Sequence, residues 1–596
     1  MKIKANLLPW VVILAGVAYS LYLVSLVPEG VFFSGDGGLK ALLAKQLSRG
    51  EFHVDLVQSP EAWIRQLWQQ GLYPYEPPFV YHLNDKYFLS FPFPFPAISA
   101  PFYALFGYWG LYIIPLISTW AIWIIAVVAC QRLKFNNWQT CLTLLALIFA
   151  SNLTVYSAMY WEHTLAVFLS FAGMVLYLIP EKETGVSRQG AIWGGCLLGL
   201  SVWFRSELVA MVATLVFLIY FVGFSKYIHQ SLTFSSLDFL RRNRELFFVG
   251  TFLTIGIFFA CNQLIYGRLL GIHAMLITEN FSWLKRAAES WNTFLSISVI
   301  IFEYFPLAIF PLFYLTSIFS KKIWGKFDFK ITVLSCVLLW LAIGLIFFSI
   351  AQTNVELKLF FSQGIIPLII VIIWLYLMRD KQLKFNGRLG FIYGLSLLFI
   401  IGVSVLVDYA PGEVIAGGKQ WGNRYVLVLL PWLSLLAVQE IENVCQITRQ
   451  LPQNLTLTIV GLLLIIGLHK NLYLGTIFLA NNYQGVSPAI QTLRERPEKF
   501  IAVSHQYAAQ MLEPELGGDK TFFSAANEQS LIQLATALKS QNQINFIYVC
   551  YPYRECKLPE ASPEQLQFTS NQGQFKIRLS KLGVLGKYPI YQGSIF

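Results

Sequence analysis

One acid in the first quarter of the chain has neighbours that could support catalysis or ligand binding. Segment 34–38 reads Ser-Gly-Asp-Gly-Gly, and its three glycines would let the backbone turn tightly and approach a ligand closely. Its carboxylate, Asp36, could act as a general base or bind a divalent cation. Asp36 could equally cap the helix that we expect over 39–47, because Asp is a good N-cap. The spacing alone leaves both roles open.

Two further motifs place charge beside aromatic rings. Segment 160–163 reads Tyr-Trp-Glu-His, and an acid near membrane depth is costly enough to indicate a function. Glu162 and His163 are therefore candidates for binding an acceptor, a sugar or a metal. Segment 203–207 reads Trp-Phe-Arg-Ser-Glu, in which Arg205 could pair with Glu207 or bind a phosphate. If a cation such as Mg²⁺ or Mn²⁺ is used, its ligands would be Asp36 and Glu162, but metal-independent chemistry fits equally well.

A late motif is rich in glycine and cations. Segment 417–425 reads Gly-Gly-Lys-Gln-Trp-Gly-Asn-Arg-Tyr. The guanidinium of Arg424 matches phosphate oxygens, so we expect Arg424 and Lys419 to bind an anionic headgroup. The alternative is a simple anchor at the membrane interface. Glu303 is one more acid, placed inside an apolar run.

Two segments combine proline with aromatic residues. Segment 73–78 reads Tyr-Pro-Tyr-Glu-Pro-Pro, and segment 91–96 alternates Phe with Pro. Such runs predict extended backbone rather than helix. They could anchor the protein at the interface or form the wall of a cleft, in which Tyr73 and Glu76 would contact a sugar or an acceptor.

The composition indicates which kind of structure holds these residues in position. Of 596 residues, 56% are hydrophobic and only 13% are charged, whereas about a quarter of a soluble protein is charged. The excess apolar surface must face lipid. The net charge of +11 does not indicate nucleic-acid binding, because the Lys and Arg residues concentrate in short loops between apolar runs.

The sequence predicts an α-helical polytopic membrane protein with about thirteen spans. The first span is read as a retained signal anchor. Basic loops alternate along the chain, which predicts a multi-pass protein of the cell (inner) membrane with a cytoplasmic N-terminus and an extracytoplasmic C-terminus. On this topology Asp36, Glu162, Arg205 and Arg424 all lie at the outer surface. The expected spans are 9–28, 108–131, 138–157, 160–179, 190–204, 207–224, 247–267, 293–319, 331–351, 360–378, 389–407, 425–441 and 455–475.

Two extracytoplasmic regions are too large to be simple connectors. The first is the loop over 29–107, inside a transmembrane domain over 1–480. The second is a C-terminal domain over 481–596, which alternates helix-like runs (488–496 and 528–540) with strand-like runs (500–503 and 544–550) and so predicts a small α/β domain. Cys550 and Cys556 lie there, and a disulfide between them is one of two open options.

Together these marks resemble the GT-C superfamily of integral-membrane glycosyltransferases, over about residues 1–480. The marks are the acid in a long first outer loop, the proline-rich segment 73–78, the Pro-Phe-Tyr-Ala-Leu-Phe-Gly run over 101–107, and Trp-Gly-Asn-Arg-Tyr late in the chain. The resemblance implies inverting transfer of a sugar from a polyprenyl-phosphate-linked donor to an extracytoplasmic glycan, lipid or protein. It assigns the catalytic acid to Asp36 and the donor phosphate to Arg424. The Gly-Asp-Gly sequence here replaces the Asp-Glu pair of some relatives.

Two other classes compete with an enzyme. A lipid or lipid-linked-sugar transporter, or flippase, would predict internal repeats and charge along a path through the membrane, but the sequence has no evident repeat. A non-catalytic assembly protein would keep the cleft but only bind lipid. Replacing Asp36 by Asn would separate these classes from a transferase.

Overall fold

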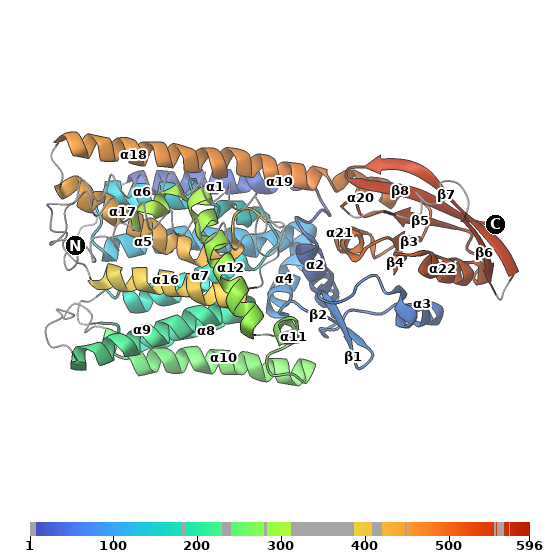
Figure 1. Ribbon diagram of the computed structural model, residues 1–596, viewed down its shortest axis with the longest axis horizontal. Helices are drawn as coiled ribbons and strands as arrows, with labels where there is room; N and C mark the ends of the chain where they lie inside the picture. Colours follow the sequence, from blue (N-terminus) through green and yellow to red (C-terminus); the bar gives the residue numbers. More distant parts are fainter. Residues whose placement is uncertain are drawn as a thin grey trace.

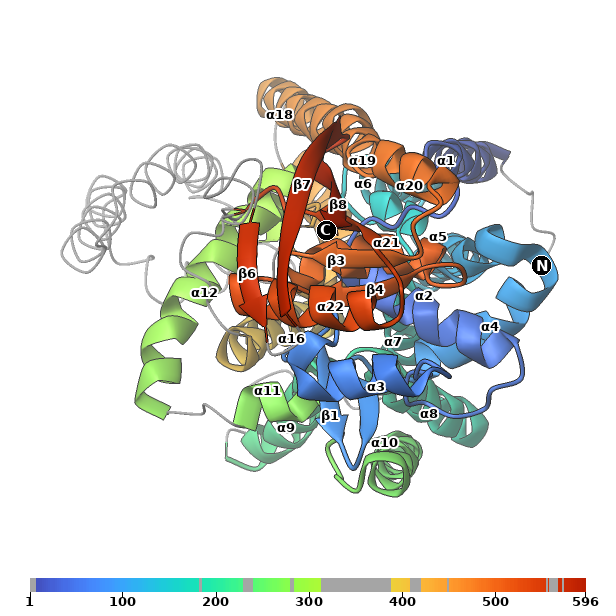
Figure 2. The same cartoon turned by 90° about the vertical axis from the view of Figure 1, so that its right-hand side faces the viewer.

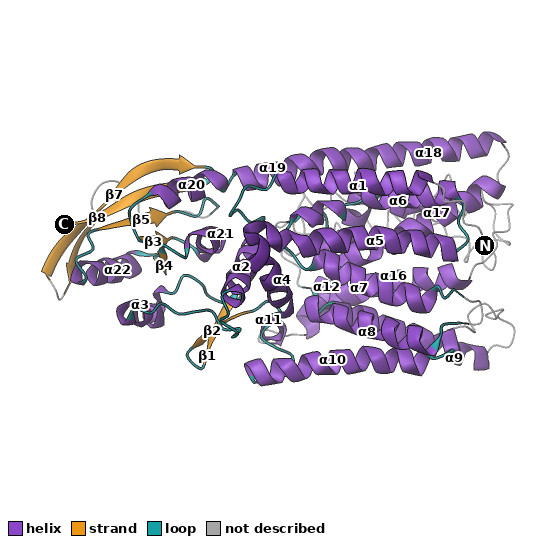
Figure 3. Cartoon of the chain, turned by 180° about the vertical axis from the view of Figure 1, so that it is seen from behind, coloured by secondary structure: helices purple, strands orange, loops and turns teal. Residues whose placement is uncertain are grey.

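The chain forms an elongated molecule with a helical bundle at one end and a sheet at the other (Figure 1). The computed structural model describes residues 7–596 apart from 182–184, 229–239, 279–282, 312–386, 408–419, 448–449, 554–555, 557–565 and 571–572. Most of the segment between the first two long helices lies between the bundle and the sheet, and its residues 62–67 lie beside the sheet (Figure 3). The C-terminus lies at the far end of the sheet, away from the bundle.

Long apolar helices make up the bundle. Six helical stretches of the described residues are long and apolar enough to cross a membrane, and shorter apolar helices accompany them. The predicted α-helical polytopic fold is confirmed. The helices are α1 (Leu7–Ser25), α5 (Ile113–Arg132), α6 (Asn137–Ile148), α7 (His163–Leu178), α8 (Arg188–Phe204), α9 (Leu208–Ile228), α10 (Arg244–Tyr266), α11 (His273–Thr278), α12 (Trp283–Tyr304), α16 (Gly387–Leu406), α17 (Leu430–Ile447), α18 (Gln450–Leu468) and α19 (Gly475–Gln484).

The number of spans near thirteen stays a prediction. The expected spans over 331–351 and 360–378, and the last part of 293–319, lie outside the described residues. The expected span over 138–157 is wrong in its second half, because α6 ends at Ile148 and a 3-10 helix follows over Thr154–Ala158. There the side chain of Ser151 donates to Leu147 O at 2.6 Å, which turns the chain out of the helix.

The first outer loop folds into its own elements. These are α2 (Gly35–Ser48), α3 (Ala62–Leu67), a π-helical turn (Trp68–Leu72), the strands β1 (Val80–Leu83) and β2 (Lys86–Leu89), α4 (Pro94–Phe106) and a 3-10 helix (Gly107–Tyr112). The two strands pair antiparallel around Asn84 and Asp85, both of which have positive φ.

The prediction of extended backbone over 91–96 is wrong from residue 94 onward. Helix α4 starts at Pro94, and Pro96 also lies in its first turn. Proline is tolerated there because the first turn of a helix leaves its N–H groups without intrahelical partners anyway. The end of the proline-aromatic run therefore begins a helix instead of excluding one.

The C-terminal part is the expected small α/β unit. Its elements are α20 (Ser487–Glu495), β3 (Phe500–Val503), α21 (Gln506–Leu516), β4 (Thr521–Ser524), α22 (Glu528–Ser540), β5 (Asn545–Val549), β6 (Leu566–Ser570), β7 (Gly573–Leu585) and β8 (Tyr588–Ile595). The strand order is β4-β3-β5-β8-β7-β6, parallel among the first three strands and antiparallel beyond them. The two predicted helices and two predicted strands are present, whereas α21 and the other four strands were not predicted. Cys550 and Cys556 form a disulfide.

One helical rod joins the bundle to the sheet. Helix α18 continues through a π-helical turn (His469–Leu474) into α19, which leads directly to α20. The π-turn is held by Asn471, whose side chain donates to Tyr304 O at 2.7 Å and to Gly467 O at 3.0 Å. Figure 1 shows this rod along one side of the molecule.

Candidate active site

Asp36 lies in the first turn of α2, at the junction of bundle and sheet. Ser34, not Asp36, caps this helix, since its hydroxyl accepts from the backbone N–H of Gly37. The expectation that Asp36 is the cap is therefore wrong, and the helix begins earlier than predicted. The carboxylate is instead free to face another charged group: Asp36 Oδ2 lies 3.3 Å from Nη1 of Arg424.

Arg424 is placed by a short, tightly held segment before α17. It starts a 3-10 helix (Arg424–Leu429), and its backbone N–H donates to Gln420 Oε1 at 2.9 Å. Asn152 anchors the same segment from the bundle by donating to Trp421 O at 2.9 Å. The guanidinium lies 5.7 Å from the ring centroid of Trp161 and 5.3 Å from that of Tyr425. Stacking of this kind fixes a guanidinium while leaving its edges free for an anion.

Glu162 is a buried acid that neutralises two cations. Its Oε2 lies 2.5 Å from Nζ of Lys40, and its Oε1 lies 3.2 Å from Nη1 of Arg205. Both Lys40 and Glu162 are at most 3% exposed. Burial alone would raise the pKa of the Glu162 carboxyl, but the charges of Lys40 and Arg205 lower that pKa to about 2. Glu162 is thus a fixed anion at the start of α7.

Of the two alternatives left open for Arg205, pairing with Glu207 is confirmed, and phosphate binding stays a prediction. Its Nε donates to Glu207 Oε1 at 2.6 Å, as a local pair would require. It also reaches Glu162, and its guanidinium lies 5.6 Å from the ring centroid of Tyr425. Tyr425 therefore lies between the two arginines, so Arg205 and Arg424 belong to one site.

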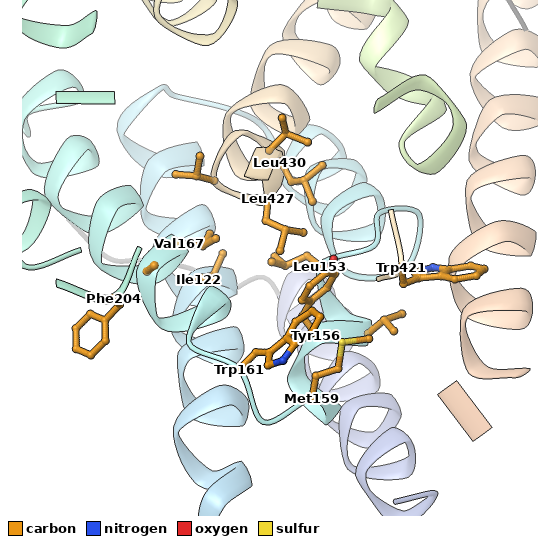
Figure 4. Packing of buried hydrophobic residues seen from close by; sticks show 14 of the residues in the cluster. Ile122, Leu153, Tyr156, Met159, Trp161, Val167, Phe204, Trp421, Leu427 and Leu430 are labelled. Carbon is orange, nitrogen blue, oxygen red and sulfur yellow. The ribbon is translucent and has the colours of Figure 1, made fainter. Parts of the chain in front are cut away.

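His163 lies under this site, packed between aromatic rings. Its ring centroid is 4.9 Å from that of Trp161 and 5.6 Å from that of Tyr156. Within the described residues neither ring nitrogen of His163 has a hydrogen-bond partner, and the hydroxyl of Tyr156 has none either. Figure 4 shows Tyr156 and Trp161 side by side in the surrounding packing, with their rings 5.8 Å apart.

Two predicted site residues lie elsewhere, and a third falls outside the described residues. The ring of Tyr73 stacks on Tyr87 at 3.7 Å, inside the first loop. Glu76 contacts the C-terminal unit, where its Oε1 accepts from Gln506 at 3.3 Å. Lys419 lies outside the described residues. The structure therefore brings together Asp36, Glu162, His163, Arg205 and Arg424, and it places Tyr73 and Glu76 at the contact between the loop and the C-terminal unit.

The described side chains do not fit a bound divalent cation. No three His, Cys, Asp or Glu side chains in the described ranges are grouped so that they could hold a metal. Both oxygens of Glu162 already face cations, which would repel a second positive charge. Asp36 alone is too few ligands for Mg²⁺ or Mn²⁺ held by protein groups.

Sequence reasoning missed Lys40, Glu207 as part of the network, and Tyr425. Lys40 follows Asp36 by four residues, and this spacing places both on one face of a helix. The expected helix began only at residue 39, so the prediction did not place Asp36 and Lys40 in one helix. Tyr425 follows Arg424 directly, but nothing in the spacing indicated that it would separate two arginines.

Comparison with solved structures gives a likeness of fold. ArnT from Cupriavidus metallidurans bound to undecaprenyl phosphate has a TM-score of 0.50 at 12% identity, covering 98% of this chain and 98% of that one. The same protein in its apo state gives 0.45 at 12% identity over 98% and 97%. The apo oligosaccharyltransferase from Archaeoglobus fulgidus gives 0.43 at 12% identity over 92% and 70%. No family model matches the sequence, and no curated protein matches it. The chain has the fold of ArnT, which confirms the expected GT-C-like fold of a multi-pass membrane protein.

Proposed function

We propose that this protein is a membrane glycosyltransferase that moves a sugar from a polyprenyl-phosphate-linked donor to an extracytoplasmic acceptor, with inversion at the anomeric carbon. The observation that carries the proposal is the contact between Asp36 and Arg424. It puts a base and a phosphate-binding group together at one end of the bundle. The fold is shared with ArnT, which has been solved with undecaprenyl phosphate bound.

The chemistry would be a single displacement. Asp36 accepts the proton of the acceptor hydroxyl while that oxygen forms a bond to the anomeric carbon. On the opposite face the bond between the anomeric carbon and the phosphate oxygen breaks, and its electron pair leaves with the polyprenyl phosphate. Arg424 and Arg205 stabilise the negative charge that develops on this leaving group. The proton ends on Asp36, so atoms and charge balance without a further reactant.

The remaining charged side chains would hold one another in fixed positions. Glu162 holds Arg205 and Lys40 in place, so their side chains do not have to be ordered when the donor binds. Trp161 is buried and supports Arg424 from within the bundle, whereas Tyr425 is partly exposed and offers an apolar ring face to a sugar. His163 and Lys419 remain candidates for contacts to the sugar and the phosphate. Tyr73 and Glu76 would affect the acceptor only indirectly, through the contact between the first loop and the C-terminal unit.

Location and partners follow from the same proposal. The protein would lie in the cell (inner) membrane with its N-terminus in the cytoplasm, and the site would face the extracytoplasmic side. Its partners would be a polyprenyl-phosphate sugar, membrane lipid, and a glycan, lipid or protein acceptor. Residues 1–480 would form the transmembrane domain and 481–596 the outer domain.

The test is replacement of Asp36 in cells. A strain lacking the protein would be complemented with wild type, with Asp36→Asn, or with Asp85→Asn, which changes an exposed acid in the β1–β2 turn. Mass spectrometry of envelope glycans and glycolipids should detect a sugar modification with wild type and Asp85→Asn only. If Asp36→Asn restores the modification, or if wild type alters no glycan or glycolipid, the proposal fails.

A further inference from the structure

Helix α21 of the C-terminal unit packs directly on α2, the helix that carries Asp36 (Figures 1 and 2). The two helices are so close that there is little room for a side chain at two positions of α2. A Cβ added at Gly35 would lie 2.1 Å from Oε1 of Gln510, and one added at Gly38 would lie 2.1 Å from the backbone O of Gln510. Real Cβ atoms do not come this near to other heavy atoms. At position 38 the backbone of α21 leaves room only for glycine, whereas at position 35 a larger residue would force the Gln510 side chain to move.

This contact changes the interpretation of the glycines around Asp36. The sequence suggested that they allow a tight turn and the approach of a ligand. In the structure neither Gly35 nor Gly38 has a positive φ, so neither is needed for an unusual backbone conformation. What approaches them is α21, and the expected role for these two glycines is therefore wrong.

A second contact holds the other end of α2 to the same helix. Nζ of Lys45 donates to Pro514 O at 2.5 Å and lies 3.3 Å from Oε2 of Glu515. The loop that follows is tied as well, because the hydroxyl of Tyr75 donates to Oε2 of Glu513 at 2.6 Å. Helix α21 therefore contacts α2 near both ends of α2.

The geometry of a helix links this grip to Asp36. Residues 35 and 38 are three apart and share one face, and that face is the one in contact with α21. Residue 36 points about 100° away from residue 35 around the helix axis, since a turn contains about 3.6 residues. Fixing the face of 35 and 38 therefore fixes the direction of Asp36, which points to Arg424.

We propose that α21 is a clamp that sets the rotation of α2: the backbone of α21 at Gln510 lies against Gly38 and so aims the Asp36 carboxylate at the reacting centre. This inference rests on the proposed transferase function. It gives the C-terminal unit a role in the chemistry: the unit completes the site from outside. Gln510 itself need not touch donor or acceptor.

The two glycines allow a test by selective rescue. An alanine at position 35 collides mainly with the side chain of Gln510, whereas an alanine at 38 collides with its backbone. Gly35→Ala and Gly38→Ala should each lower sugar transfer about tenfold or more, because small misplacements of a reacting group are costly. Gln510→Gly should restore transfer largely in Gly35→Ala and not in Gly38→Ala. Gly518→Ala is the control, since its Cβ would meet nothing within 4 Å.

Each variant is compared as the full chain in nanodiscs and in the complemented strain. Undecaprenyl phosphate binding should not weaken in these variants, because the clamp is proposed to position the base and not the residues that bind the phosphate. Hydrogen exchange of the α2 amides should be faster in Gly35→Ala and Gly38→Ala and unchanged in Gly518→Ala. Transfer as in wild type for both single variants, or rescue of both or neither by Gln510→Gly, overturns the clamp.

Failure of the clamp and failure of the proposed function have different signatures. If wild type modifies no glycan, the proposed transferase function falls, and hydrogen exchange alone decides whether α21 fixes α2. Unchanged exchange in Gly35→Ala and Gly38→Ala then overturns the clamp, and faster exchange confined to α2 supports it. If wild type transfers sugar while both variants match it, only the clamp is refuted.

Discussion

Nη1 of Arg424 lies 3.3 Å from Oδ2 of Asp36, although the two residues are 388 positions apart. Arg424, the group proposed to bind the phosphate, thus contacts Asp36, the group proposed to accept the proton. On the proposed mechanism, an arriving phosphate would compete with Asp36 for the guanidinium, and its binding would free the carboxylate to accept a proton. Donor binding and release of the base would then be coupled through one arginine.

Replacing Arg424 by Lys should weaken binding of undecaprenyl phosphate by about tenfold or more, since an ammonium cannot make the paired bonds of a planar guanidinium. Titration of the lipid into nanodiscs measures the loss. Arg244→Lys is the matched control, because Arg244 also pairs with a neighbouring acid, Glu245, but lies away from the site. Equal affinity of Arg424→Lys and wild type for the lipid would contradict a role for Arg424 in binding the phosphate.

The buried pair of Lys40 and Glu162 should behave as a unit in stability measurements. Glu162→Gln alone leaves the buried charge of Lys40 without its partner, which costs about 3–5 kcal/mol, whereas Lys40→Met should cost less because Glu162 keeps Arg205 at 3.2 Å. The double variant should recover a large part of that loss, because both charges are gone. Thermal unfolding of the four proteins gives the coupling free energy. Strict additivity of the two single effects would show that the pair does not interact.

Glu162 should also make the protein sensitive to acid. Its carboxyl has a folded pKa of about 2 against an ordinary value of 4.5. As the pH falls from about 4.5 toward 2, the unfolded chain takes up this proton before the folded chain does, so stability is lost over that window. The melting temperature of wild type should therefore decline more steeply below pH 4.5 than that of Glu162→Gln. Parallel curves would contradict a depressed pKa.

The contact between Tyr75 and Glu513 should titrate near neutral pH. Burial, opposed by the hydrogen bond from Tyr75, raises the pKa of the Glu513 carboxyl from 4.5 to about 7. Between pH 4.5 and 7 the unfolded chain has released this proton while the folded chain keeps it, so stability falls as the pH rises. Glu513→Gln should lose this decline in melting curves between pH 5 and 8, whereas Glu495→Gln, at an exposed position, should keep it. A decline that persists in Glu513→Gln would assign the titration to another group.

The sequence supported the large-scale prediction because membrane constraints are strong and local. Apolar length alone identified helices such as α1, α10 and α16, since lipid allows few alternatives. Alternation of short runs identified β3 and α22 with the bounds that the structure has. Strands β6 to β8 were missed because glycine and polar residues interrupt their apolar alternation, as Gly583 does in β7 and Gly593 does in β8.

The site was only partly predictable because its contacts are long-range. Topology placed Asp36, Glu162, Arg205 and Arg424 at one surface, and the structure brings them together. No local pattern relates Asp36 to Arg424, or Gly38 to Gln510, because these pairs form only after the bundle and the C-terminal unit have packed. Tyr73 and Glu76 have residue types suited to sugar binding, yet they lie in a contact between two outer segments.

The helical rod of α18 and α19 sets a fixed height for the outer unit. At about 1.5 Å per residue, a helix crosses the roughly 30 Å hydrocarbon core with about 20 residues. The stretch from Gln450 to Gln484 is longer than that, and it is helical throughout, including the π-turn at His469–Leu474. A continuous helix of this kind, in place of a flexible tether, holds α21 at one distance from the bundle. The contact between α21 and α2 should therefore be insensitive to the thickness of the surrounding bilayer.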